Sequence, residues 1–180
     1  MLPPELPEGW AVDYRQTRGC IGRDEQPYTS TVMTTELFLR YIHFISIFAI
    51  VGALASEYVL LKKTLTRGEL SRLAKVDAVY GIAALTLLVA GLTLWLGGYG
   101  KPSEFYSKNW VFHLKLSLFV VVGLLSIYPT VFFLKQRKGN PDEEVSVPET
   151  VHWMLRIELL LMLIIPMLAG LMSRGLGYFG

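Results

Sequence analysis

The sequence is poor in cysteine and in charged residues. Its 180 residues include a single cysteine, and only 18% are charged, against a hydrophobic fraction of 52%. One thiol, Cys20, cannot form an internal disulfide. The G-x-S-x-G, Walker, CxxC and HExxH motifs are all missing, which leaves no basis for a hydrolase or a nucleotide-binding protein. A dispersed net charge of +2 also argues against a nucleic-acid partner.

Long apolar runs are what the chain has in abundance. Four of them approach the roughly 20 residues that a helix needs to cross a bilayer. A lipid-exposed backbone must satisfy its own amides, and four segments are too few for a closed barrel, so these runs are predicted to be helices. We therefore predict an all-α fold, an integral membrane four-helix bundle over residues 36–180, preceded by a polar tail over residues 1–35. The predicted spans are 37–61, 77–96, 110–134 and 151–172.

The charges of the connecting segments predict an orientation. Residues 62–75 hold five basic residues and one acidic residue, and residues 135–144 open with three more basic residues. Basic loops tend to stay on the cytoplasmic side of a membrane. Both termini are then expected outside.

Two histidines fall within the apolar runs. His43 lies 19 residues before Lys62, and His113 lies 22 residues before Lys135. At about 1.5 Å per residue these separations are roughly 28 and 33 Å, so both imidazoles are expected near the outer leaflet. Two imidazoles at one depth in a helix bundle can hold a haem iron, and we predict His43 and His113 as its ligands. The alternative for each is an interfacial histidine that hydrogen-bonds to a loop carbonyl.

Helical periodicity places some of these groups on the same face. On the first span a stripe facing the bundle is predicted for His43, Ser46, Ile50, Ala53 and Glu57. On the third span Lys115 points about 200° away from His113, so the two cannot face one pocket unless the helix bends. Lys115 is therefore either a functional group or a lysine that reaches the headgroups.

A second polar group is expected at the other end of the bundle. It comprises Glu57, Asp77, His152, Arg156 and Glu158. Charges inside spans are costly, so they normally pair or serve a path for protons or ions. We expect an interhelical pair such as Arg156 with Glu57, with proton exchange through Glu57 and Glu158 as the alternative.

Several segments resemble known families. WVFHLKLSLFVVVGL resembles the F-H-x-K-L segment of the HemJ-type protoporphyrinogen IX oxidases, and YIHF and RIELLLMLIIP resemble parts of their first and late helices. More closely, residues 37–134 resemble a family of predicted bacterial four-helix membrane proteins, through SEYVLLKK, VDAVYGIAA and GLLSIYPTVFF. The resemblance to this second family implies no particular activity. The bacterial inner membrane is the location that it implies.

The oxidase resemblance implies haem b bound by His43 and His113, with Lys115 in binding or proton transfer. It departs after the first histidine, where those oxidases carry a Pro-Arg pair and this chain has the region around Glu57. The leading hypothesis is a haem b-binding membrane redox protein, in which Lys115, Glu57 and Glu158 are the candidate catalytic residues. It would act as an oxidase of a hydrophobic, porphyrin-like substrate or as an electron carrier to quinone.

Two other functions compete with this hypothesis. The first is a cofactor-free structural or assembly subunit, either of a larger membrane complex or of a homo-oligomer, in which the histidines only hydrogen-bond at interfaces. The second is a proton-coupled transporter, which ranks last because the sequence shows no inverted repeat.

Overall fold

The computed structural model describes residues 26–97, 99 and 103–177. Within them, two short strands and a short helix accompany four long helices. The long helices are α1 (Gln26–Leu60), α2 (Arg67–Leu96), α4 (Trp110–Gln136) and α5 (Glu149–Ser173). The short elements are β1 (Thr64–Thr66), α3 (Ser103–Ser107) and β2 (Glu144–Ser146).

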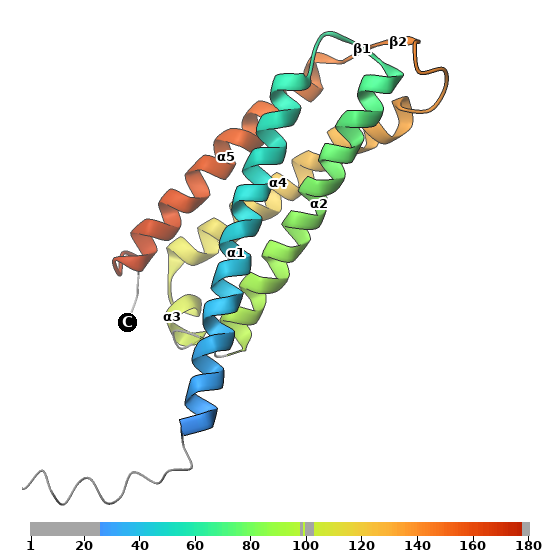
Figure 1. The fold of residues 1–180 in the computed structure, drawn as a ribbon. Coiled ribbons are helices and arrows are strands. Elements are labelled where there is room, and N and C mark those ends of the chain that lie inside the picture. The colour runs from blue at the N-terminus through green and yellow to red at the C-terminus, as the bar shows by residue number, and fades with distance from the viewer. Residues whose placement is uncertain (1–25, 98, 100–102, 178–180) are drawn as a thin grey trace, which may run out of the picture.

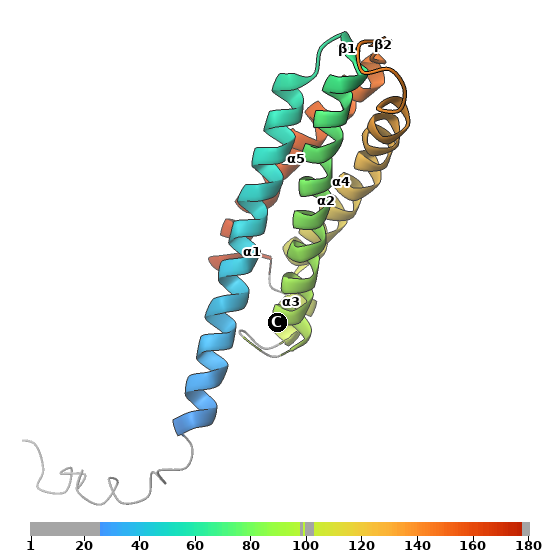
Figure 2. The same cartoon turned by 45° about the vertical axis from the view of Figure 1, so that its right-hand side comes forward.

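The four long helices run alternately up and down and form one bundle (Figure 1). α1 and α4 each pack against both α2 and α5. Turning the molecule shows that α1 reaches beyond the other helices at the end where the described chain begins (Figure 2). Each long helix is long and apolar enough to cross a membrane. The predicted all-α membrane bundle is confirmed.

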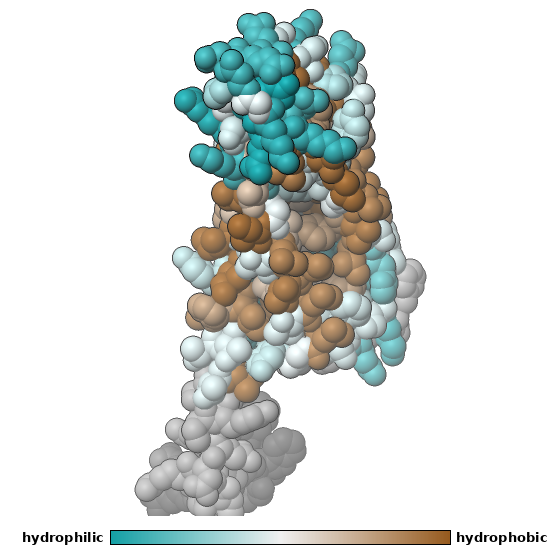
Figure 3. Space-filling view, turned by 90° about the vertical axis from the view of Figure 1, so that its right-hand side faces the viewer, coloured by the Kyte–Doolittle hydropathy of each residue, from teal (hydrophilic) through white to brown (hydrophobic). Residues whose placement is uncertain are grey.

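An apolar belt surrounds the bundle. Only 17 to 22% of the residues in the most apolar stretch of each helix are buried inside the structure, so most of them face outward. Figure 3 shows this belt below a strongly hydrophilic cap at the end that carries the two strands. Such a surface suits contact with the hydrocarbon of a bilayer.

The inner face of α1 follows the predicted stripe. Ser46, Ile50, Ala53 and Glu57 are all buried, and His43 is half-buried one turn before them. Ile50 belongs to the main core, with Leu54 of the same helix and with Leu73, Val122 and Leu155 from the neighbouring helices. The 3.6-residue period therefore identified the face of α1 that looks into the bundle.

Two helices begin earlier than the predicted spans. α1 begins at Gln26 and α2 at Arg67, each about ten residues before the expected start, because the helices continue beyond the length that hydrocarbon requires. At α2 the cause is a capping box: the Thr66 hydroxyl accepts from the Glu69 amide, and the Glu69 carboxylate accepts from the Thr66 amide. Residues 1–25 of the predicted tail lie outside the described residues.

The strands join the two basic loops at what we call the strand end of the bundle. β1 and β2 pair antiparallel, with Leu65 opposite Val145. Arg67 binds both carboxylate oxygens of Glu143, at 2.7 and 2.9 Å, and also the carbonyls of Gln136 and Lys138. These bonds from Arg67 hold the pKa of Glu143 below its ordinary value. The loop before α2 is thereby fixed to the loop that follows α4.

The capping box gives a first prediction. Replacing Thr66 with Ala removes the acceptor for the Glu69 amide, so the free energy of unfolding should fall by about 1 kcal/mol. Chemical unfolding in mild detergent, followed by circular dichroism, measures this. Thr64→Ala, an exposed strand position, is the matched control. Equal losses in the two variants would contradict the assigned role of the cap.

Candidate functional site

His43 lies against the backbone of α2. A Cβ built on Gly91 would lie 3.3 Å from Cε1 and 3.5 Å from Nδ1 of the imidazole. The hydrogen that Gly91 carries in place of a side chain is therefore what allows this close approach. The ring is half-buried at the contact between α1 and α2.

A cavity of about 120 Å³ opens beside this imidazole, lined by residues of all four long helices. Its wall is mostly apolar and includes Trp95 and Phe112, whose rings pack edge to face with centroids 4.9 Å apart. One cation, Lys115, belongs to the lining. We call this space the His43 cavity.

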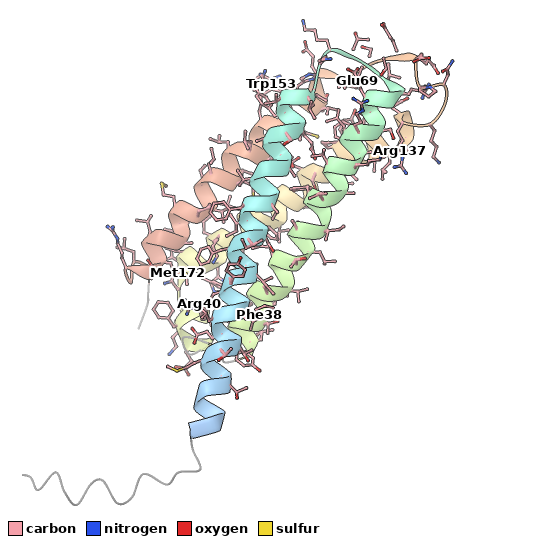
Figure 4. All side chains as sticks on the ribbon, viewed as in Figure 1. Phe38, Arg40, Glu69, Arg137, Trp153 and Met172 are labelled. Atoms are coloured by element: carbon pink, nitrogen blue, oxygen red, sulfur yellow. The ribbon has the colours of Figure 1, made fainter. Side chains whose placement is uncertain are left out.

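A second hollow, of about 220 Å³, continues the His43 cavity away from the strand end. It shares His43, Trp95 and Lys115 with the first and extends to Arg40 and Met172. Figure 4 shows Arg40 and Met172 at that end of the bundle. Together the two spaces approach the size of small-ligand sites, which begin at about 300 Å³.

The polar groups around the His43 cavity are poorly satisfied. Trp95 Nε1 is buried and makes no hydrogen bond, and the buried Nδ1 of His43 makes none with ordinary geometry, although the Leu87 carbonyl lies close to the imidazole. No carboxylate among the described residues pairs with Lys115, whose Nζ lies 5.4 Å from the centre of the Phe112 ring. A buried polar group without a partner is costly, and such groups are rare in folded proteins. The arrangement fits a ligand that would supply hydrogen-bond acceptors.

Arg40 lies at the outer part of the second hollow and is paired along its own helix. Its Nε lies 2.8 Å from Oε1 of Glu36, one turn earlier, and its side chain is 49% exposed. An exposed pair at this spacing stabilises little. Opening this pair for an anionic group that enters from this end would therefore cost little free energy.

His113 does not line either hollow. Its side chain is exposed, and Nε2 lies 2.9 Å from the carbonyl oxygen of Ser107, to which the ring N–H donates. Lys115, two residues later, faces the His43 cavity, so the helical period turns His113 outward. The structure thus brings His43 together with Lys115 and not with His113. For each histidine, the sequence left open the alternative of a hydrogen bond to a backbone carbonyl, and His113 makes such a bond.

The position of His113 affects the prediction that His43 and His113 together hold a haem. A haem held between two histidines needs both imidazoles at one cavity, and the structure supplies only His43 there. The residues present do not fit the predicted pair of ligands. A single axial ligand, His43, is the arrangement that they leave open.

The second predicted polar group forms a buried cluster toward the strand end. Glu57, Asp77 and Glu158 come from three different helices and are 1%, 5% and 0% exposed. The Thr130 hydroxyl donates to Asp77 at 2.9 Å. Oε1 of Glu57 makes no hydrogen bond, and neither carboxyl oxygen of Glu158 makes one with ordinary geometry, although the Tyr80 hydroxyl lies close to Glu158. We call Glu57, Asp77 and Glu158 the acid cluster.

The expected pair of Arg156 with Glu57 is not formed. Arg156 is exposed, and its guanidinium lies 5.8 Å from the Tyr58 ring centre and 5.4 Å from that of Trp153. The prediction was wrong because Glu57 points into the bundle, whereas Arg156 remains on the outer surface near the headgroup region. His152 lies near the start of α5, where Nδ1 is 3.4 Å from the Pro148 carbonyl.

Sequence reasoning missed Trp95 and Tyr80 as residues of the two sites. Both share the inner face of α2 with Asp77 and Gly91, at steps of three or four residues. Applying to α2 the periodicity argument that located the stripe on α1 would have found them.

The fold and its surface define a class of protein, a four-helix membrane protein with polar groups buried at two levels. The chain belongs to the family described as predicted membrane protein (DUF2214), whose model matches residues 35–177. This confirms the closer of the two resemblances. Searches of curated proteins and of solved structures give no significant match.

The close contact at Gly91 gives a second prediction. Gly81→Ala meets no atom within 4 Å and should stabilise α2 by about 0.5–1 kcal/mol. Gly91→Ala should lack this gain, because the imidazole of His43 must move, and should recover it when His43 is also replaced by Ala. Unfolding free energies of the single and double variants measure the coupling. An equal gain at both glycines with His43 intact would refute the contact.

Proposed function

We propose that the protein is a membrane redox protein that binds a quinone-like ring compound in the His43 cavity. The observation that carries the proposal is that three groups line one mostly apolar space: two buried ring nitrogens, His43 Nδ1 and Trp95 Nε1, and the ammonium of Lys115, which pairs with no described carboxylate. A quinone head group has a flat apolar ring and carbonyl oxygens that accept hydrogen bonds.

The chemistry of the wall suits such a ligand. The Trp95 and Phe112 rings offer flat apolar contacts, and Lys115 and Trp95 carry hydrogen-bond donors. Negative charge develops on the oxygens of a quinone when it is reduced, and a nearby ammonium stabilises that charge more strongly in an apolar site than in water. Lys115 is therefore the residue expected to favour the reduced ligand.

Haem b is the second candidate occupant. Its support is the resemblance of YIHF and WVFHLKLSLF to the HemJ-type oxidases, together with the unpartnered Nδ1 of His43. On this proposal His43 is a single axial ligand. A porphyrin-like substrate is the corresponding proposal for an enzyme.

A cofactor-free structural or assembly subunit, within a larger complex or a homo-oligomer, is the alternative from another class. The observation that favours it is the hydrogen bond from His113 to the Ser107 carbonyl, in which a histidine only joins the end of α3 to α4. On this alternative the His43 cavity holds nothing specific.

The location is also a proposal. The strand end carries most of the basic residues of the two connecting loops and is the hydrophilic cap of Figure 3. By the positive-inside rule we place it in the cytoplasm and both termini outside, with the protein in the bacterial inner membrane.

Binding of a short-chain ubiquinone to the purified protein, followed by quenching of tryptophan fluorescence, tests the proposal. We expect saturable binding, weakened about tenfold to a hundredfold by Lys115→Met, which removes a charge-assisted hydrogen bond worth roughly 1.5–3 kcal/mol. His113→Ala, outside the cavity, is the control and should bind as the unmodified protein does. Non-saturable quenching, or equal loss in both variants, would reject quinone binding.

The visible spectrum of the same preparation, expressed with ample haem, separates the other two candidates. A Soret band that sharpens on reduction with dithionite, and is lost in His43→Ala but kept in His113→Ala, would establish haem instead. With neither a Soret band nor saturable quinone binding, the cofactor-free subunit would be the better description.

A further inference from the structure

Each of the four long helices contributes a polar side chain at one level near the strand end. Glu57 comes from α1, Asp77 from α2, Thr130 from α4 and Glu158 from α5. Glu57 lies fourteen residues after His43, so this level is roughly 21 Å along α1 from the His43 cavity. The acid cluster is a separate site.

The cluster contains no cation to balance its carboxyl groups. The charges of Glu57 and Glu158 interact with that of Asp77, and Tyr80 of α2 lies close to Glu158. From α4, Ser126 lies beside the Tyr80 hydroxyl, and the Thr130 hydroxyl donates to Asp77. Among the described ion pairs none involves the acid cluster.

Three neighbouring carboxyl groups in this setting cannot all be ionised. Burying one carboxylate without a partner costs several kcal/mol, and like charges nearby add repulsion. The cluster must therefore hold protons. No three His, Cys, Asp or Glu side chains among the described residues are placed to bind a metal ion together.

The space between the acid cluster and the His43 cavity is partly unfilled. A third cavity, of about 210 Å³, is lined by Tyr80, which lies close to Glu158 of the cluster. It shares Leu88, Phe119 and Met162 with the lining of the His43 cavity. Tyr80 is its one lining residue with a polar side chain, so a proton that crossed this space would meet the Tyr80 hydroxyl first.

We infer that Glu57, Asp77 and Glu158 form a proton-exchanging site that takes protons from the strand end and supplies them toward the His43 cavity. Each proton that leaves a carboxyl group of the cluster is replaced by a proton taken from water at the strand end. Two such transfers supply two protons. The supply role rests on the proposed function, since a quinone takes up two protons with the two electrons of its reduction. The exchange itself does not depend on any ligand.

Infrared spectroscopy of the unmodified protein in phosphatidylcholine vesicles tests the exchange. We expect the carbonyl band of protonated carboxylic acid at neutral pH, shifting in D₂O within minutes because the protons exchange. Its absence, or a band that does not shift in D₂O, would overturn the inference. Loss of the band on adding sodium ions would also overturn it, in favour of a cation site.

Variants assign the band to the cluster. Glu158→Gln and Glu57→Gln preserve shape and should each remove part of the band, whereas Glu149→Gln, an exposed acid in the first turn of α5, should leave it unchanged. An unchanged band in both cluster variants would place the protonated acid elsewhere and reject the site. The result for the unmodified protein stands even if a variant fails to fold.

Reduction of bound short-chain ubiquinone by added dithionite tests the supply role. Dithionite provides the two electrons, and loss of the quinone's ultraviolet band reports the rate. Glu158→Gln should slow the reaction about tenfold or more without changing the quinone affinity, since a positioned proton donor typically contributes at least that much. Equal rates would reject the supply role. Failure of quinone to bind would reject the proposed function while leaving the D₂O result unaffected.

Discussion

The cost of a polar group without a partner in an apolar environment is the constraint on which this structure depends. In a membrane helix bundle the backbone groups hydrogen-bond within the helices. The free-energy cost of polar groups without partners therefore comes from side chains. Among the described residues, buried side-chain atoms that make no hydrogen bond of ordinary geometry belong to His43, Trp95, Glu57 and Glu158, all inside the bundle. Around them the structure is an ordinary bundle with an apolar outer surface.

The two groups of polar side chains differ in charge and in chemistry. The His43 cavity offers donors and one ammonium group, which suit acceptor oxygens of a ligand. The acid cluster holds carboxyl groups that suit the storage of protons. An apolar layer around Ile50, Phe119 and Met162 separates them, with a cavity within it. On the proposed function, a ligand would be bound at one level and protons held at another, a division that suits a redox reaction coupled to protons.

The sequence predicted the parts of this arrangement that follow from periodicity and hydropathy. The membrane bundle follows from the four long apolar runs. The buried stripe of α1 follows from residues that recur every three or four positions, because such residues share one face of a helix. The sequence also predicts that Lys115 and His113 face different ways on α4, and the structure places Lys115 at the His43 cavity and His113 outside it. Depth states only the level of a residue, whereas the face decides which cavity it meets.

Other features could not be reached from sequence by the same means. The contact of His43 with Gly91 depends on how closely two helices approach, and Arg156 turned outward because the rings of Tyr58 and Trp153 were available on the surface. The capping box of Thr66 and Glu69, in contrast, is a local pattern that was readable and would have placed the start of α2 correctly.

The central claim is that a molecule from the membrane completes the His43 cavity, and the mass of the protein as extracted from its own membranes tests it most directly. Native mass spectrometry should show one added ring compound of quinone type, retained in His113→Ala and lost in Lys115→Met. A bare polypeptide mass in the unmodified protein, under conditions that keep lipids bound, would contradict the account.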